Sequence, residues 1–253
     1  MSEQQTTPSG QELLQGWPFH LRELRTRLLW AFLGLAAATI LSFIFAEQIL
    51  LILMEPYGET LQTLRPTEGI ETYFKIALLS GVIIAMPWIA LQLWIFISEG
   101  LESNEKRYVY VFVPAATVLF LTGVAFAWFI LIPTAISFLS TFLPDVFDTQ
   151  WTSQEYISFV TGFIFWLGVA FQMPLIFYFL ARLGIVTAKA LRDQWRIAIV
   201  GVAVIAAIIT PSIDPVTMLL TMTPLLILYL LSIVLAKVGQ RQFDARMVAY
   251  TDE

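Results

Sequence analysis

Long apolar stretches without charged residues alternate with short polar segments along this chain, and this pattern predicts six membrane-spanning helices. The candidate spans lie near residues 28–49, 76–97, 109–136, 156–181, 197–210 and 216–236. A helix needs about 20 apolar residues to cross the roughly 30 Å of hydrocarbon in a bilayer. The fifth run is too short for this because Pro211 ends it, whereas the third continues to Pro144 and predicts a helix that protrudes into the following loop.

The composition supports a membrane protein. The chain has 253 residues, of which 58% are hydrophobic and 13% are charged, whereas a soluble domain carries about 25% charged residues. Residues 1–16 are polar and predict a disordered tail. The apolar run that follows them has no clear signal-cleavage site, so we interpret it as a retained span. The chain has no cysteine, which excludes disulfides.

Positive charges gather on one predicted side of the membrane. Of the 14 Lys and Arg residues, all but Arg65 and Lys75 lie before the first span, between spans two and three, between spans four and five, or after span six. Cytoplasmic segments of membrane proteins are enriched in Lys and Arg. The pattern therefore predicts that both termini are cytoplasmic, in agreement with an even number of spans.

Most of the predicted spans contain proline, which removes a backbone donor and bends a helix. The prolines are Pro87, Pro114, Pro133, Pro174 and Pro224. Bent helices of unequal length suit an open, concave scaffold on which another molecule docks. The alternative is that these prolines reflect only the ordinary frequency of proline in membrane helices.

A search for catalytic and metal-binding motifs is negative. The single histidine excludes an H-E-x-x-H zinc site, and the sequence has no G-x-S-x-G, P-loop or G-x-G-x-x-G motif. There is no basic face of the kind that binds nucleic acid. The sequence therefore predicts a protein that is not an enzyme and holds no metal or cofactor.

Two groups of polar residues stand out against this background. Gln172 lies in the middle of the fourth span, where it could bond the carbonyl that Pro174 frees or form a polar docking point for another helix. On the predicted cytoplasmic side, Glu23 could pair with Arg27 at i,i+4. Acidic residues also follow the second span, at Glu99, Glu102 and Glu105. Together with Glu23 they indicate a cytoplasmic site for a cationic ligand.

Several segments resemble a known family in their order and spacing. They are "HLRELRTRLL" before the first span, "EPYGETL" after it, "ETYFKIALLSGVIIAMPWIALQLWIFISEGL" through the second, "NEKRY", "FQMPLIF" in the fourth and "ITPSIDPVTM" between the last two. Over residues 17–240 the chain resembles the TatC family, the signal-receptor subunit of the twin-arginine protein translocase. Residues 241–253 would form a second cytoplasmic tail.

This resemblance implies a fold and a function. Members are cup-shaped proteins of six helices, with both termini in the cytoplasm and short fifth and sixth helices, in the bacterial cytoplasmic membrane. They bind the paired arginines of export signal peptides and assemble with single-span subunits of the TatA/TatB type and with copies of themselves. Folded cargo then crosses at the expense of the proton-motive force, without nucleotide hydrolysis by this subunit.

The resemblance also assigns roles to individual residues. Its acidic signal contacts fall on Glu23 and Glu105, accompanied by Arg25 and Phe96. It also points to Pro56 and Asp214 in the extracytoplasmic loops, and to Gln172, where relatives often carry glutamate. In the partner-docking region it points to Thr210 and to Met218, where some relatives have glutamine. Threonines near the outer end of the last two spans, including Thr217, Thr221 and Thr223, predict hydrogen bonds to a docked helix.

Two other classes of protein compete with this interpretation. A small-solute or ion-coupled carrier should bind its substrate near the membrane midplane, whereas the acidic residues of this chain concentrate at the predicted cytoplasmic surface. An intramembrane hydrolase would need a catalytic pair, and His20, the only histidine, precedes the first span.

Overall fold

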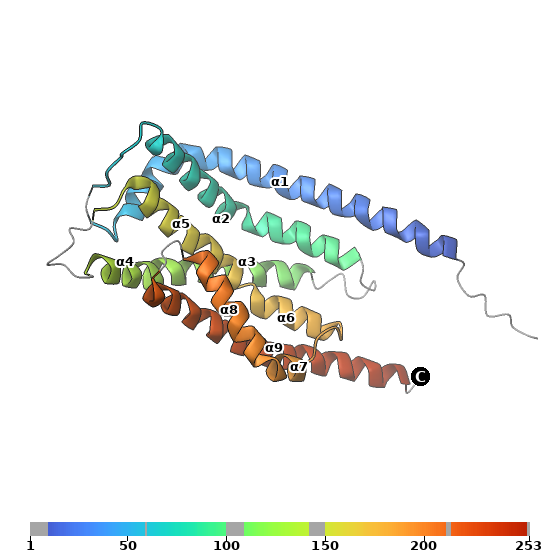
Figure 1. Ribbon diagram of the computed structural model, residues 1–253. Coiled ribbons are helices and arrows are strands. Elements are labelled where there is room, and N and C mark those ends of the chain that lie inside the picture. The colour runs from blue at the N-terminus through green and yellow to red at the C-terminus, as the bar shows by residue number, and fades with distance from the viewer. Residues whose placement is uncertain (1–9, 59, 100–108, 142–149, 211–213, 252–253) are drawn as a thin grey trace, which may run out of the picture.

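The described part of the chain is mainly helical. The computed structural model describes residues 10–58, 60–99, 109–141, 150–210 and 214–251. The helices are α1 (Gly10–Met54), α2 (Glu68–Glu99), α3 (Val109–Phe126), a π-helical segment (Ala127–Leu131), α4 (Ile132–Ser140), α5 (Ser153–Ala170), α6 (Met173–Arg182), α7 (Ala188–Asp193), α8 (Trp195–Ile209) and α9 (Pro215–Thr251). Figure 1 shows the start of α1 and the ends of α2, α6 and α9 on one side of the bundle. Lysines and arginines of α1, α6 and α9 lie there, and we call this side the basic end.

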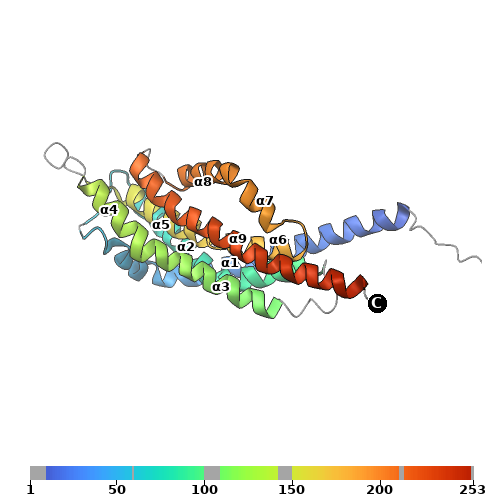
Figure 2. The ribbon, with the colours of Figure 1, turned by 90° about the horizontal axis from the view of Figure 1, so that it is seen from below.

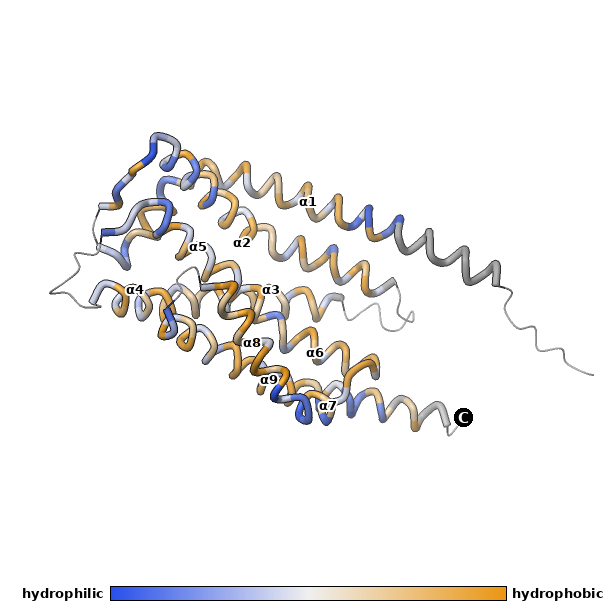
Figure 3. The backbone as a smooth tube through the Cα atoms, viewed as in Figure 1, coloured by the Kyte–Doolittle hydropathy of each residue, from blue (hydrophilic) through white to orange (hydrophobic). Residues whose placement is uncertain are grey.

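The helices confirm the six predicted spans. Five helical segments are long and apolar enough to cross a membrane, and they are Arg22–Met54, Glu68–Ser98, Tyr110–Ser140, Ser153–Arg182 and Pro215–Ala245. The sixth is the shorter helix α8, whose 15 residues extend about 22 Å. Figure 3 shows that the apolar colouring follows these spans and gives way to polar residues at their ends. The all-α polytopic class is therefore confirmed, with a short fifth span.

The outermost helices extend further than the sequence predicts. Helix α1 begins at Gly10, inside the stretch for which we expected disorder. Helix α9 continues to Thr251, so residues 241–251 prolong a helix. Its apolar part ends at Ala236, before Lys237, and is long enough to cross a membrane. The third span ends with α4 at Ser140, and the rest of its predicted protrusion lies outside the described residues.

Prolines account for the irregular geometry within two of the spans. Pro133 has no N–H to give to the carbonyl four residues before it, and the π-helical turn directly precedes it, with Ile132 N bonded to Ala127 O. Pro174 follows the break between α5 and α6, where Gln172 N turns back to Val169 O at 3.0 Å. The long helices α2, α3 and α9 also contain a proline each.

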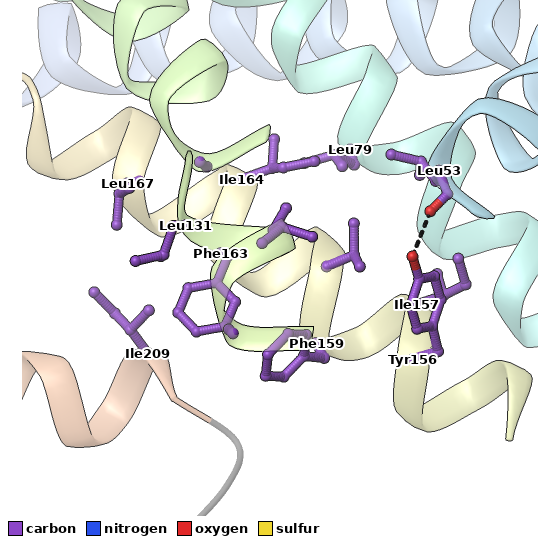
Figure 4. Close-up of a cluster of buried hydrophobic side chains, with 14 of the residues drawn as sticks. Leu53, Leu79, Leu131, Tyr156, Ile157, Phe159, Phe163, Ile164, Leu167 and Ile209 are labelled. Atoms are coloured by element: carbon purple, nitrogen blue, oxygen red, sulfur yellow. Dashed lines mark hydrogen bonds between the residues drawn. The ribbon is translucent and has the colours of Figure 1, made fainter. Parts of the chain in front are cut away.

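The helices pack on their neighbours around a core that is centred on α5. Helix α1 runs antiparallel to α2 along its length, α2 and α3 contact α5, and α9 packs on α6 and α8. Figure 2 shows α8 on the outside of α9. Side chains of α5, including Tyr156, Phe163 and Leu167, are fully buried among residues of the neighbouring helices, as Figure 4 shows. The hydroxyl of Tyr156 donates to Leu53 O at 2.8 Å and so joins α5 to the end of α1.

Glu68 holds the loops together at the end of the bundle opposite the basic end. Its carboxylate accepts hydrogen bonds from Leu64 N at 2.9 Å, Arg65 N at 3.2 Å, Ser153 Oγ at 3.1 Å and Gln154 N at 2.8 Å. The side chain is 2% exposed. A buried carboxylate is stable when its oxygens are satisfied in this way. It therefore joins the start of α2 to the start of α5 and to the loop that follows α1.

Candidate functional site

Glu23 lies at the basic end of α1 and contacts a neighbour on its own helix. Its Oε1 is 2.6 Å from Nε of Arg27, and the Glu23 side chain is 20% exposed. The predicted i,i+4 pair is thus confirmed, as a close ion contact that is not aligned as a hydrogen bond. Arg25, between the two, is exposed. The arrangement offers a half-buried carboxylate surrounded by arginines where α1 enters its apolar stretch.

The other predicted signal contacts lie near the last turns of α2. Glu102 and Glu105 follow α2 in the sequence and lie outside the described residues. Phe96 is half-buried on α2. The structure therefore places Glu23 and Phe96 on the adjacent helices α1 and α2, near the basic end of the bundle. Glu105 remains a prediction from the sequence.

An aromatic cluster that sequence reasoning missed lies at the same end. The ring of Trp94 stacks on Phe112, with centroids 4.2 Å apart, and meets Phe179 edge-on at 4.9 Å. All three side chains are buried. Edge-to-face and stacked aromatic pairs stabilise packing beyond the area that they bury. The cluster joins the end of α2, the start of α3 and the end of α6, and Glu105 lies in the sequence between α2 and α3.

Gln172 forms a hydrogen bond between two helices of the chain. Its Nε2 donates to Ala116 O on α3 at 3.0 Å, and its side chain is half-buried. The amide N–H thus bonds a carbonyl of α3 and not the carbonyl that Pro174 frees. Helices α3 and α5 also approach each other closely at Gly123, where a Cβ would lie 2.7 Å from Leu167 O.

We expect Gln172→Leu to lower the stability of the solubilised protein by about 0.5–1.5 kcal/mol, since hydrogen bonds between membrane helices have that magnitude. Thr117→Val is the matched control. The Thr117 hydroxyl bonds Val113 O on its own helix, so its loss should cost less. Denaturant titration in detergent measures both variants. Equal stability of Gln172→Leu and the parent chain would show that this bond contributes nothing.

Pro56 and Asp214 lie at the end of the bundle opposite the basic end. Pro56 is half-buried in the turn that follows α1. Asp214 precedes α9, and its Oδ1 accepts a hydrogen bond from Thr217 N at 2.6 Å. This is the geometry of an N-cap, and Pro215 at the first helical position is the residue that favours a helix start. Asp214 therefore has a local structural role at the start of α9.

Three of the four threonines near the junction of α8 and α9 are buried, and their hydrogen bonds to a docked helix remain a prediction. Thr210, Thr217 and Thr221 are 6%, 1% and 0% exposed. Thr210 and Thr221 donate to carbonyls of their own helices, at 2.8 and 2.9 Å. Met218 is half-buried against the main core. Thr223 is exposed and bonds Leu219 O, so a surface for a partner here is mainly apolar.

The polar groups of this bundle orient helices and loops. No group of three or more His, Asp or Glu residues that could hold a metal ion occurs within the part of the chain that the structure describes. The charged residues concentrate at the ends of the bundle, and one end is rich in arginine. Fold and polar groups together define a polytopic membrane protein.

Comparison with known proteins identifies the family. A family model described as "Sec-independent protein translocase protein (TatC)" matches residues 19–224. The chain belongs to the TatC family. It is therefore a component of a protein translocase, which transports proteins and is not an enzyme.

Individual relatives agree over most of the chain. The Sec-independent protein translocase protein TatC of Helicobacter pylori (strain J99) is 39% identical over 86% of this chain and 87% of its own length. The chloroplastic protein TATC of Arabidopsis thaliana is 34% identical over 83% of this chain and 63% of its own. A crystal structure of "Twin Arginine Translocase Receptor- TatC" superimposes with a TM-score of 0.79, at 37% identity, over 87% of this chain and 99% of the other.

Proposed function

We propose that this chain is the receptor of a twin-arginine translocase and binds the paired arginines of signal peptides at the basic end of its bundle. One observation carries the proposal. Glu23 is a half-buried carboxylate among arginines, at the point where α1 enters its apolar stretch. A carboxylate partly withdrawn from water binds a guanidinium more strongly than an exposed one does.

The chemistry of the carboxylate supports a preference for arginine. A guanidinium binds a carboxylate through two parallel hydrogen bonds, whereas an ammonium has no such planar fork. Glu105 follows α2, which runs antiparallel to α1 and ends beside it at the basic end. Two carboxylates from separate segments can therefore recognise two adjacent arginines, with Arg25 and Phe96 at the edge of the site.

The direct experiment is binding of a purified twin-arginine signal peptide to the detergent-solubilised chain. We expect saturable binding that weakens strongly when the peptide carries Lys-Lys in place of Arg-Arg. Equal affinity for the two peptides would contradict recognition by fitted carboxylates and would leave only general attraction between opposite charges.

The scaffold role rests on the exposed apolar surface of α8 and α9. We infer that single-span TatA/TatB-type subunits and further copies of the chain dock on membrane-embedded surfaces, and that the assembled complex uses the proton-motive force. The short α8 supports docking on α8 and α9, because a helix of about 22 Å is shorter than the hydrocarbon layer and makes the protein thin at this place.

We further propose that the chain lies in the bacterial cytoplasmic membrane with the basic end in the cytoplasm. The chain has no cysteine, so single cysteines report on topology directly. Leu64→Cys, at a position 74% exposed, should react with an impermeant thiol reagent in intact spheroplasts, because it lies at the outer end. Thr187→Cys, exposed beside α7, should react only after permeabilisation. The reverse pattern would invert the proposed orientation.

A further inference from the structure

A basic pocket lies between α7 and α9, away from Glu23. It has a volume of about 730 Å³, and four cations line it. These residues are Lys189 and Arg192 of α7 and Lys237 and Arg241 of α9. Asp193 and Asp244 are the acidic residues of the lining. Figure 3 shows the polar colouring of both helices around this region.

Hydrogen bonds hold the walls of the pocket in place. Gln240 Oε1, on α9, accepts from the backbone N–H of Ala188 at 3.2 Å. The hydroxyl of Tyr229, also on α9, donates to the carbonyl of Leu191. The start and the middle of α7 are therefore both fixed to α9, and the pocket exists before any ligand enters.

The charge of the pocket favours an anion. Four cations oppose two carboxylates, and none of the four forms an ion pair with a carboxylate in the part of the chain that the structure describes. Like charges gathered around a concave site repel one another, and a bound anion relieves that repulsion. For the same reason the pocket repels the arginine pair of a signal peptide.

The surroundings place the pocket at the membrane interface. Lys237 directly follows the apolar part of α9, and the apolar side chains of Ile233 and Val234 line the pocket on that side. Trp195 begins α8, is 52% exposed and stacks under Arg196 at 5.5 Å. Tryptophan and arginine in such positions are typical of the boundary between headgroups and hydrocarbon.

Exposed apolar side chains continue from the pocket toward the membrane interior. On α8 they include Ile197, Val200 and Val204, and on α9 Leu230 and Val234, each at least 55% exposed. A ligand that fits all of this surface has an anionic head and a long apolar tail. An acidic protein segment would match the charges but not the apolar faces beside them.

We propose that the α7–α9 pocket binds the headgroup of an anionic phospholipid, whose acyl chains lie along the exposed faces of α8 and α9. The cations neutralise the phosphate, and Ile233 and Val234 contact the first carbons of the chains. This lipid would fix α7 and the start of α8 at the interface, because α8 is shorter than a bilayer of ordinary thickness. The site is separate from the proposed receptor site.

The test uses tryptophan quenching by brominated lipids in nonionic detergent micelles that hold the purified chain. Dibrominated phosphatidylglycerol is titrated against dibrominated phosphatidylcholine, and the difference from a Trp195→Phe variant isolates the signal of Trp195. We expect phosphatidylglycerol to quench that signal at a lower mole fraction. Arg192→Gln/Lys237→Gln should raise the required fraction at least about tenfold, since each cation near an anionic surface contributes roughly fivefold.

Controls separate this site from general electrostatics and from other anions. Arg22→Gln/Arg65→Gln removes the same charge elsewhere and should leave the titration within about twofold. Should the double pocket variant fail to fold, Lys237→Gln alone should still weaken binding roughly fivefold. Equal effects of the pocket and control variants would overturn the proposal. So would displacement of the lipid by millimolar inorganic phosphate or by a glutamate-rich peptide, which would assign the pocket to a free anion or an acidic protein.

Discussion

A Glu23→Gln variant should bind a twin-arginine signal peptide roughly tenfold to a hundredfold more weakly than the parent chain does. Loss of one member of a desolvated charge pair costs about 2–5 kcal/mol, whereas an exposed pair contributes at most about 1 kcal/mol. Glu23 is 20% exposed and lies between these limits. Glutamine keeps the size of the side chain and its ability to form hydrogen bonds, so the variant removes only the charge.

The structure supplies a competing explanation and a way to test it. Glu23 contacts Arg27, so it could serve α1 alone. If it does, Glu23→Gln should leave peptide affinity unchanged at low and at high salt. If Glu23 binds the peptide, Arg27→Gln should not reproduce the loss, because the carboxylate remains. Peptide titrations of both variants at two salt concentrations distinguish these cases.

The same loss is expected for Glu105→Gln, and Glu105→Arg should be more severe because it adds repulsion. The neighbouring acids Glu99 and Glu102 are the controls for this loop. If their replacement by glutamine weakens binding as much, the peptide is attracted by the net charge of the segment and not by two fitted carboxylates. Glu55→Gln, at the outer end, should have no effect.

Gly81→Ala should destabilise the protein by about 1–3 kcal/mol, the usual cost of forcing extra volume into a packed interface. A Cβ at this position of α2 would lie 2.7 Å from Cα and 2.9 Å from N of Thr39 on α1. Backbone atoms cannot rotate away, so α1 must move from α2. Since α1 carries Glu23 and α2 leads to Glu105, the variant should also weaken signal-peptide binding. Thermal unfolding in detergent and peptide titration measure the two effects.

Two other glycines provide matched controls. A Cβ at Gly162, in α5, meets nothing within 4 Å, so Gly162→Ala should be neutral or slightly stabilising, because glycine is unfavourable inside a helix. At Gly34 the three atoms nearest to a Cβ all belong to the side chain of Trp88, which is 40% exposed and can shift. Gly34→Ala should therefore cost less than Gly81→Ala. Equal stability of all three variants would show that α1 and α2 are not in close contact.

The sequence predicts the spans well because lipid imposes a simple requirement on them. Charges are expensive within the hydrocarbon, so charge-free runs mark the helices, and Pro211 marks the end of the short α8. Helix ends are less predictable. Residues 10–16, for which the sequence predicts disorder, are helical, and α9 continues beyond Lys237. A helix in water needs no apolar run, so hydropathy does not report where it stops.

The direction in which side chains face could not be predicted for the same reason. These helices are apolar around their whole circumference, so no apolar stripe distinguishes the buried face. The sequence drew attention to Phe96, whereas Trp94 is the residue buried against Phe112 and Phe179. Similarly, Thr217 and Thr221 face inward, and Gln172 meets a carbonyl 56 positions earlier in the chain. Only the packing of α2 against α3 and α6, of α3 against α5 and of α9 against α8 decides these cases.

The π-helical turn at Ala127–Leu131 makes the third span unusually tolerant of a change in length. This turn contains one residue more than the same rise needs in an α-helix, because its hydrogen bonds join residues five apart. Deleting one residue there would restore α-helical bonding and leave α4 facing as it does now. Deleting one residue from α3 would instead rotate everything beyond it by about 100°, and would turn Ile132 and Ile136 out of the core that they now share with α5.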